Sequence, residues 1–158
     1  MRRKLDSILE VTVICLLSLM VLDILWQVLA RYVLGNPSSF SDELAGYLLI
    51  WTGLFGAALA SGRHLHLAID LFPNSRNGVS AKVAETFVYA CMALFSLSIL
   101  IIGGSRLIYM TWILEQRSAA MNLPLALVYA AIPMSGLCLL TYALLDIKGV
   151  WTQKEATP

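Results

Sequence analysis

Three long stretches of this 158-residue chain contain no Asp, Glu, Lys or Arg. They are residues 44–62, 86–105 and 118–145. As α-helices, each is long enough to cross a hydrocarbon core of roughly 30 Å, which needs about 20 apolar residues. Backbone amides in that core have no water to bond, so a helix must satisfy them internally. The pattern therefore predicts an all-α integral membrane protein.

The composition excludes several other classes of protein. Charged residues make up 13% of the chain, against about 25% in soluble domains. With a further span before residue 44, the chain holds four spans. The rest of it is then divided among short tails and loops, none of which reaches the size of a catalytic domain. The net charge of +1 gives no concentrated basic face for nucleic acid. We expect no enzyme activity, no cofactor and no nucleic-acid partner, with lipid as the surroundings.

Helix breakers divide the chain into four predicted spans within a single membrane domain, residues 1–158. The sequence Gly35-Asn36-Pro37 ends the first span, Pro124 suits the first turn of the last, and Pro133 is expected to bend that last span. The predicted spans are residues 8–34, 42–62, 82–112 and 123–146.

The segment 63–72, after the second span, has the pattern of an amphipathic helix. Its apolar residues lie at i, i+3, i+4 and i+7, namely Leu65, Ala68, Ile69 and Phe72. Such a helix can lie along the membrane surface. On its polar side we expect His66 and Asp70, four residues apart, to pair.

No metal or haem site is predicted. His64 and His66 are two residues apart and do not share a helical face, whereas axial haem ligands approach the iron from opposite sides. The cysteines lie within apolar runs, and no two have metal-ligand spacing. These cysteines are Cys15, Cys91 and Cys138.

The basic residues predict how the chain lies in the membrane. With four spans, both termini share one side, which would hold eight of the eleven Lys and Arg residues. Arg31, Arg106 and Arg117 would lie on the opposite side. Because short cytoplasmic loops carry an excess of Lys and Arg, we expect both termini in the cytoplasm.

Asp23, Gln27 and Arg31 form a polar seam, because residues four apart share a helical face. A charge in mid-membrane costs at least about 2.5 to 3.5 kcal/mol, so such residues normally face protein or a wet cavity. The seam is expected either to dock on another subunit or to bond within this chain, with Arg31 extending to the membrane surface. A third possibility is a proton site at Asp23.

Asp42 and Glu43 begin the second span, close in depth to Arg31 at the end of the first. An ion pair of Arg31 with these carboxylates would clamp the two span ends together. Carboxylates in the first turn of a helix are also favoured by the helix dipole, so both interpretations stay open.

Small residues recur about every four positions along the second span, which allows close approach of another helix. The pattern does not say whether that helix belongs to this chain or to a partner. The residues are Gly53, Ala57, Ala58, Ser61 and Gly62.

The block from residue 26 to 70 resembles the small membrane subunit of tripartite ATP-independent periplasmic (TRAP) transporters, the DctQ family. The resemblance covers about 45 residues, and the last two spans agree with the family in length and hydropathy only. The matching residues are Gln27, Arg31 and Tyr32 in QVLARYVLG, Ser41-Asp42-Glu43-Leu44 and Trp51 in SDELAGYLLIW, Gly56-Ala57-Ala58, and His66 and Asp70 in HLHLAID.

The resemblance implies a multi-pass protein of the bacterial inner membrane. It would act as the small permease, or scaffold, subunit beside a large permease subunit that holds the substrate and ion sites. A periplasmic substrate-binding protein would complete a symporter for organic acid uptake, driven by an ion gradient, commonly sodium. As a separate hypothesis, outward-facing residues near 36–43 and 117–122 touch the binding protein.

Two other classes stay open. A homodimeric, small multidrug-type exporter coupled to protons through Asp23 would transport a substrate without other subunits. A haem or quinone anchor of a respiratory enzyme would, in its haem form, show a Soret band, although the histidine spacing argues against that form.

Overall fold

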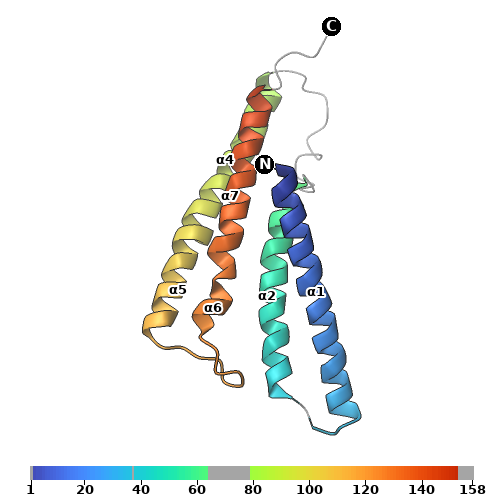
Figure 1. Ribbon diagram of the computed structural model, residues 1–158. Helices are drawn as coiled ribbons and strands as arrows, with labels where there is room; N and C mark the ends of the chain where they lie inside the picture. The colour runs from blue at the N-terminus through green and yellow to red at the C-terminus, as the bar shows by residue number, and fades with distance from the viewer. Residues whose placement is uncertain (1, 37, 64–78, 153–158) are drawn as a thin grey trace.

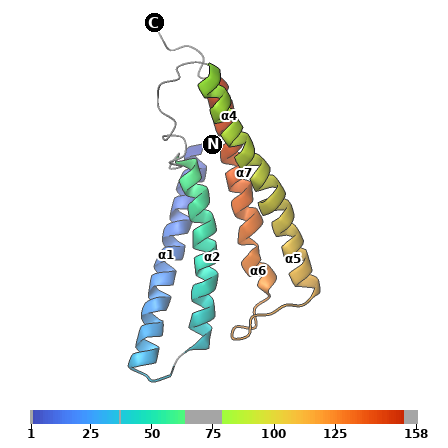
Figure 2. The same cartoon turned by 180° about the vertical axis from the view of Figure 1, so that it is seen from behind.

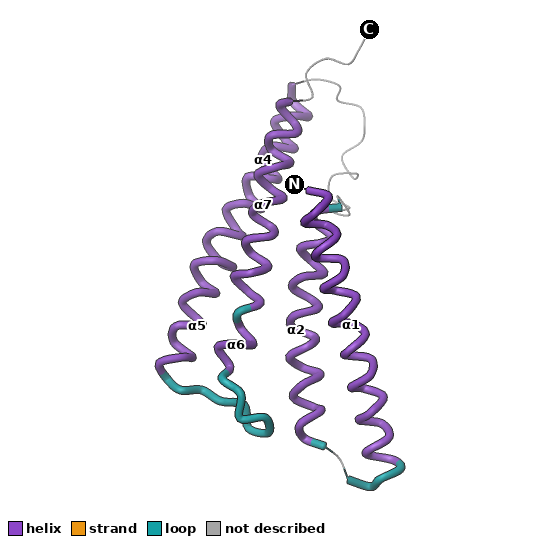
Figure 3. The backbone as a smooth tube through the Cα atoms, viewed as in Figure 1, coloured by secondary structure: helices purple, strands orange, loops and turns teal. Residues whose placement is uncertain are grey.

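The computed structural model describes residues 2–36, 38–63 and 79–152 of the chain. All the regular elements in these residues are helices, as Figure 3 shows. Four helical segments are long and apolar enough to cross a membrane, so the predicted all-α membrane fold is confirmed. They are Arg2–Tyr32, Ser39–Gly62, Lys82–Ile113 and Leu125–Trp151.

The first two spans are single helices, and the last two are built from several pieces. The first span is α1 (Arg2–Tyr32) and the second is α2 (Ser39–Gly62). The third comprises α4 (Val79–Phe95), the π-helix η1 (Ser96–Gly103) and α5 (Gly104–Ile113), and the fourth comprises α6 (Leu125–Tyr129) and α7 (Ala131–Thr152).

The break between α6 and α7 falls at Ala130, three residues before Pro133. A proline has no N–H to donate, and its ring collides with the carbonyl four residues earlier, here that of Tyr129. The Ala130 N–H is shared between the carbonyls of Ala126 (3.1 Å) and Leu127 (3.3 Å). This interruption is the predicted effect of Pro133.

The spans form two hairpins, α1 with α2 and α4–η1–α5 with α6–α7 (Figure 1). α2 and α7 are neighbours, and the hairpins lie closest together near Arg2, in both views (Figures 1 and 2). We call this the N-terminal end. Residues 33–36, which follow α1, and the connection 114–124 both lie at the opposite end, which we call the loop end.

The hairpins share a small buried core near the N-terminal end. Leu9 of α1, Phe55 and Ala58 of α2 and Tyr142 of α7 pack together, and the Trp51 and Phe55 ring centroids are 5.8 Å apart. Most other large apolar side chains are exposed. Along its 31 residues, α1 buries only three: Leu9, Asp23 and Ala30. The outward faces therefore require lipid or another protein around them.

Glycine allows the third and fourth spans to cross closely. A Cβ at Gly136 would lie 2.7 Å from the Leu100 Cβ, and one at Gly104 would lie 2.9 Å from Ile132 Cγ2. About one turn before Leu100, the buried Ser96 hydroxyl donates a hydrogen bond to the Gly136 carbonyl at 2.5 Å. The crossing fixes the depth of α5 relative to α7.

Most of the predicted amphipathic segment 63–72, including His66 and Asp70, lies outside the described residues. Its first residue, Arg63, follows the last turn of α2, and its N–H bonds to the Leu59 carbonyl at 3.1 Å. The Arg63 guanidinium pairs with Glu10 of α1 at 2.7 Å.

Candidate functional site

The polar seam of α1 is bonded to α2 through Gln27. The Gln27 Nε2 donates to Asp23 Oδ2 at 3.1 Å and to the Ser41 carbonyl at 2.8 Å. Asp23 and Ser41 are buried, so these bonds satisfy polar atoms between the two helices. Through Gln27, these hydrogen bonds join Asp23 to the start of α2 within this chain.

Arg31 is exposed, and the described residues include no ion pair between it and Asp42 or Glu43. Glu43 instead faces the connection 114–124. Its carboxylate accepts hydrogen bonds from the Ser118 hydroxyl, from the Ala120 N–H at 3.1 Å and from the Met121 N–H at 3.3 Å. Glu43, just after the first turn of α2, thereby anchors the loop between α5 and α6.

Replacing Glu43 with alanine should release this loop. Three donors lose a charged acceptor, and hydrogen bonds to charged groups are the stronger ones. We expect amide hydrogen exchange at Ala120 and Met121 to accelerate by roughly tenfold or more. The matched control is Asp42→Ala, which removes the exposed neighbouring carboxylate. Unchanged exchange in Glu43→Ala, or equal acceleration in the control, would contradict the assignment.

The small residues of α2 divide between two faces. Ala58, Ser61 and Gly62 are buried, whereas Gly53 and Ala57 are exposed. At Gly62, the ring of Tyr142 occupies the space where a Cβ would lie, with three ring carbons 2.5 to 2.8 Å from that position. Gly62 therefore allows close packing between α2 and α7 within the chain.

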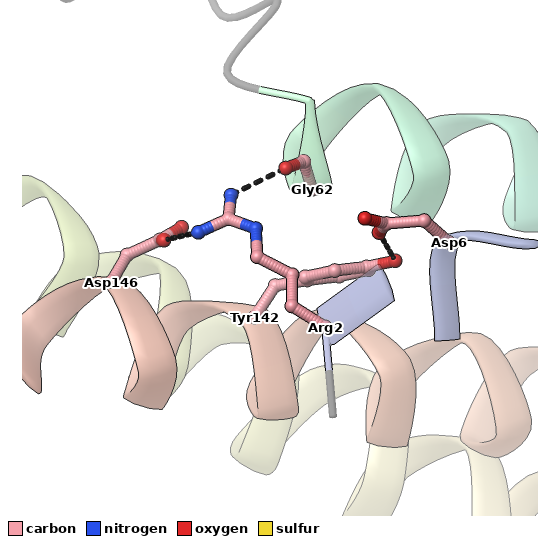
Figure 4. Close-up of polar contacts among 5 residues, drawn as sticks. All are labelled: Arg2, Asp6, Gly62, Tyr142 and Asp146. Carbon is pink, nitrogen blue, oxygen red and sulfur yellow. Dashed lines mark hydrogen bonds and ion pairs between the residues drawn. The ribbon is translucent and has the colours of Figure 1, made fainter. Parts of the chain in front are cut away.

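A set of polar contacts at the N-terminal end joins three helices (Figure 4). Arg2 of α1 pairs with Asp146 of α7 at 2.5 Å and donates to the Gly62 carbonyl at 2.5 Å. The Tyr142 hydroxyl donates to Asp6, and the Arg2 guanidinium lies 5.9 Å from the centre of the Tyr142 ring. We call these five residues the N-terminal cluster.

Sequence reasoning missed this cluster, because it used Arg2 only as one positive charge in a topology count. One signal was available. Arg2 and Asp6 are four residues apart, as are Tyr142 and Asp146, so each pair shares a helical face. That spacing shows two polar faces at span ends, but it does not show that the two faces meet.

The described polar residues act chiefly by joining helices to one another. Among them, no three His, Cys, Asp or Glu side chains gather as a metal site. A pocket at the loop end is lined by residues 111, 112, 115–117 and 124. The two hairpins are in contact at both ends, through Arg2 with Asp146 and through Glu43 with the connection 114–124.

Comparison with known proteins finds a family that matches most of the chain. The family described as "Tripartite ATP-independent periplasmic transporters, DctQ component" matches residues 20–153. The C4-dicarboxylate TRAP transporter small permease protein DctQ of Vibrio cholerae is 27% identical over 165 residues, covering 90% of this chain and 70% of that protein.

Two sialic acid transporter proteins are similar over shorter segments. The TRAP transporter small permease protein SiaQ of Vibrio cholerae is 32% identical over 72 residues, covering 46% of this chain and 42% of SiaQ. The TRAP transporter permease protein SiaT of Haemophilus influenzae is 33% identical over 73 residues, covering 44% of this chain but 12% of SiaT. Each of these matches spans less than half of the relative's length.

The family match begins within α1 and ends just after α7, so it takes in part of the first span and all of the other three. The resemblance first seen in residues 26–70 therefore extends over most of the chain. This protein belongs to the DctQ family of TRAP transporter small permease subunits.

Proposed function

We propose that this chain is a static, non-enzymatic scaffold in a TRAP-type symporter for an organic acid. In this proposal it binds a large permease subunit in the membrane, and a periplasmic substrate-binding protein delivers the substrate. An ion gradient, with sodium the ion that the resemblance favours, drives uptake. The observation that carries the proposal is the family match over residues 20–153.

Two further observations support a scaffold that binds a larger partner. The 73 residues matching SiaT make up 12% of that protein, so a segment of this kind also occurs within a much longer permease polypeptide. In this chain, the Asp23–Gln27 and Arg2–Asp146 contacts join its own helices. Such contacts favour a rigid frame, which a moving transport subunit needs.

We place the protein in the bacterial inner membrane with both termini in the cytoplasm. Arg2, Arg3 and Lys4 begin α1 and Arg63 follows α2, all at the N-terminal end. The positive-inside rule puts that end in the cytoplasm, and the loop end then faces the periplasm. A reporter that works only in the cytoplasm should be active when it is fused after Pro158. Activity of a reporter that works only in the periplasm would contradict this orientation.

The partners are testable by co-expressing the tagged chain with the large permease from the same genome. We expect the two to co-purify from detergent. Together with the binding protein, they should take up substrate in proteoliposomes only under an ion gradient. Transport by this chain alone would instead identify an exporter, and a Soret band would identify a haem anchor. Either result would overturn the proposal.

The exposed part of the seam is proposed to dock on these partners. Arg31 is the exposed residue of the seam and lies near the loop end. Asp42, in the first turn of α2, is also exposed. Arg31→Leu should leave the melting temperature of the isolated chain unchanged while lowering complex recovery or uptake. Wild-type assembly and uptake in both Arg31→Leu and Glu43→Ala would show that this region makes no contact important for docking.

A further inference from the structure

Arg106 lies on the face of α5 that points away from the rest of the subunit. The inward side of α5 carries the buried residues Gly104 and Thr111. At 100° per residue, Arg106 lies on the opposite side, and its side chain is exposed. Three exposed apolar residues lie on the same face as Arg106: one four residues before it, one three residues after it and one seven residues after it. We call Ile102, Arg106, Tyr109 and Ile113 the α5 outer face.

Contacts between the spans place Arg106 at membrane depth. Gly104 packs against Ile132 of α7, and one turn from Ile132 the Val128 carbonyl accepts a hydrogen bond from Trp51 Nε1 at 3.0 Å. Arg106 therefore lies close to the depth of Trp51. Trp51 is eight residues along α2 from Glu43, or about 12 Å at 1.5 Å per residue.

The end of α5 gives a similar depth. Arg106 lies seven residues before Ile113, the last residue of the helix, which is about 10 Å. The turns in between are apolar and exposed, with Tyr109 at 63%, Trp112 at 64% and Ile113 at 55%. Side chains of this kind belong in lipid or against protein. The backbone of Arg106 therefore lies within the apolar part of the span.

Charged groups at such depth normally face protein and are paired. Asp23 follows this rule, because it is buried and accepts a hydrogen bond from Gln27. Arg106 is exposed instead, and no hydrogen bond or ion pair of its side chain occurs among the described residues. A counter-charge for Arg106 is therefore absent from the part of the chain that the structure describes.

We propose that the α5 outer face packs against a transmembrane helix of the large permease subunit, and that Arg106 pairs with a carboxylate on that helix. The inference rests on the proposed association with that subunit. A guanidinium and a carboxylate form two parallel hydrogen bonds. Ile102 and Tyr109, on either side, would exclude water from the pair and so strengthen it.

The test measures how much large subunit is recovered with the tagged chain after detergent extraction. Arg106→Leu leaves the partner carboxylate unpaired, and Arg106→Glu adds repulsion. We expect both to lower recovery by roughly tenfold or more. Arg106→Lys keeps the charge and should retain most of the complex. The matched control is Arg117→Leu, which removes an exposed arginine in the connection 114–124 and should leave recovery unchanged.

A second readout separates protein from lipid as the occupant. Arginine can also extend along an apolar surface to a lipid phosphate. A photo-crosslinking residue at Tyr109 should join the chain to the large subunit. Crosslinking to lipid only, or full recovery with Arg106→Leu, would overturn the inference. So would a lower melting temperature of the isolated Arg106→Leu chain, because the residue would then act within the subunit.

These results are distinct from failure of the proposed function. If the unsubstituted chain retained no large subunit, the proposed association itself would be wrong. If the unsubstituted chain retained it and the Arg106 variants did so equally, only the α5 outer face would be wrongly assigned.

Discussion

Gly62→Ala is expected to destabilise the isolated subunit by about 1 to 3 kcal/mol, the usual range for overpacking a well-packed site. The added Cβ would lie 2.5 to 2.8 Å from three carbons of the Tyr142 ring. That ring cannot easily move aside, because it is fully buried and its hydroxyl is bonded to Asp6. α2 and α7 must therefore separate, which also weakens the bond from Arg2 to the Gly62 carbonyl.

Thermal unfolding of the purified chain in detergent measures this effect. The matched control is Gly53→Ala in the same helix, where a Cβ would meet nothing within 4 Å. Alanine is favoured over glycine in a helix interior by up to about 1 kcal/mol, so the control should be as stable as the parent or more stable. Equal melting temperatures of Gly62→Ala and the parent would refute close packing at this contact.

Asp146→Leu is expected to have a comparable or larger effect on stability. Asp146 is 6% exposed, and its Oδ1 atom lies 2.5 Å from Nη1 of Arg2. Removing one partner of a buried ion pair leaves the other charge uncompensated, which costs about 3 to 5 kcal/mol when both are buried. Because the Arg2 side chain is 35% exposed, water compensates part of that loss. We expect about 2 to 3 kcal/mol.

The Glu10–Arg63 ion pair provides the matched comparison. Both of its side chains are nearly half exposed, at 46% and 45%, so Glu10→Leu should cost less than about 1 kcal/mol. The double variant Arg2→Met with Asp146→Leu should recover part of the stability lost in Asp146→Leu, because no guanidinium then remains that has lost its carboxylate. Equal losses in Asp146→Leu and Glu10→Leu would show that burial does not strengthen the Arg2–Asp146 pair.

The membrane character, the four spans and the family were accessible from residues alone. Span length depends on an unbroken run of apolar residues, and helix ends depend on local breakers such as Gly35 and Pro133. The break at Ala130 follows from the same local chemistry, since the proline ring acts on the turn that precedes it. Each of these inferences needs only neighbours along the chain.

The partners of the polar residues were less accessible. Glu43 was considered for an ion pair with Arg31, whereas its carboxylate holds the connection 114–124. Arg2 entered only the topology count, although it joins three helices at the N-terminal end. Among the small residues of α2, nothing in the spacing separated the buried Gly62 from the exposed Gly53.

Hydropathy and local helix breakers were therefore enough to predict apolar helices of bilayer length. They also identified the few polar residues whose exposure to lipid would be unfavourable. Which groups meet depended on how deeply the helices lie and how each is rotated. Depth and rotation arise where helices touch, as at Gly62 against Tyr142 and Gly136 against Leu100. Those contacts join residues far apart in the chain, so spacing along it does not reveal them.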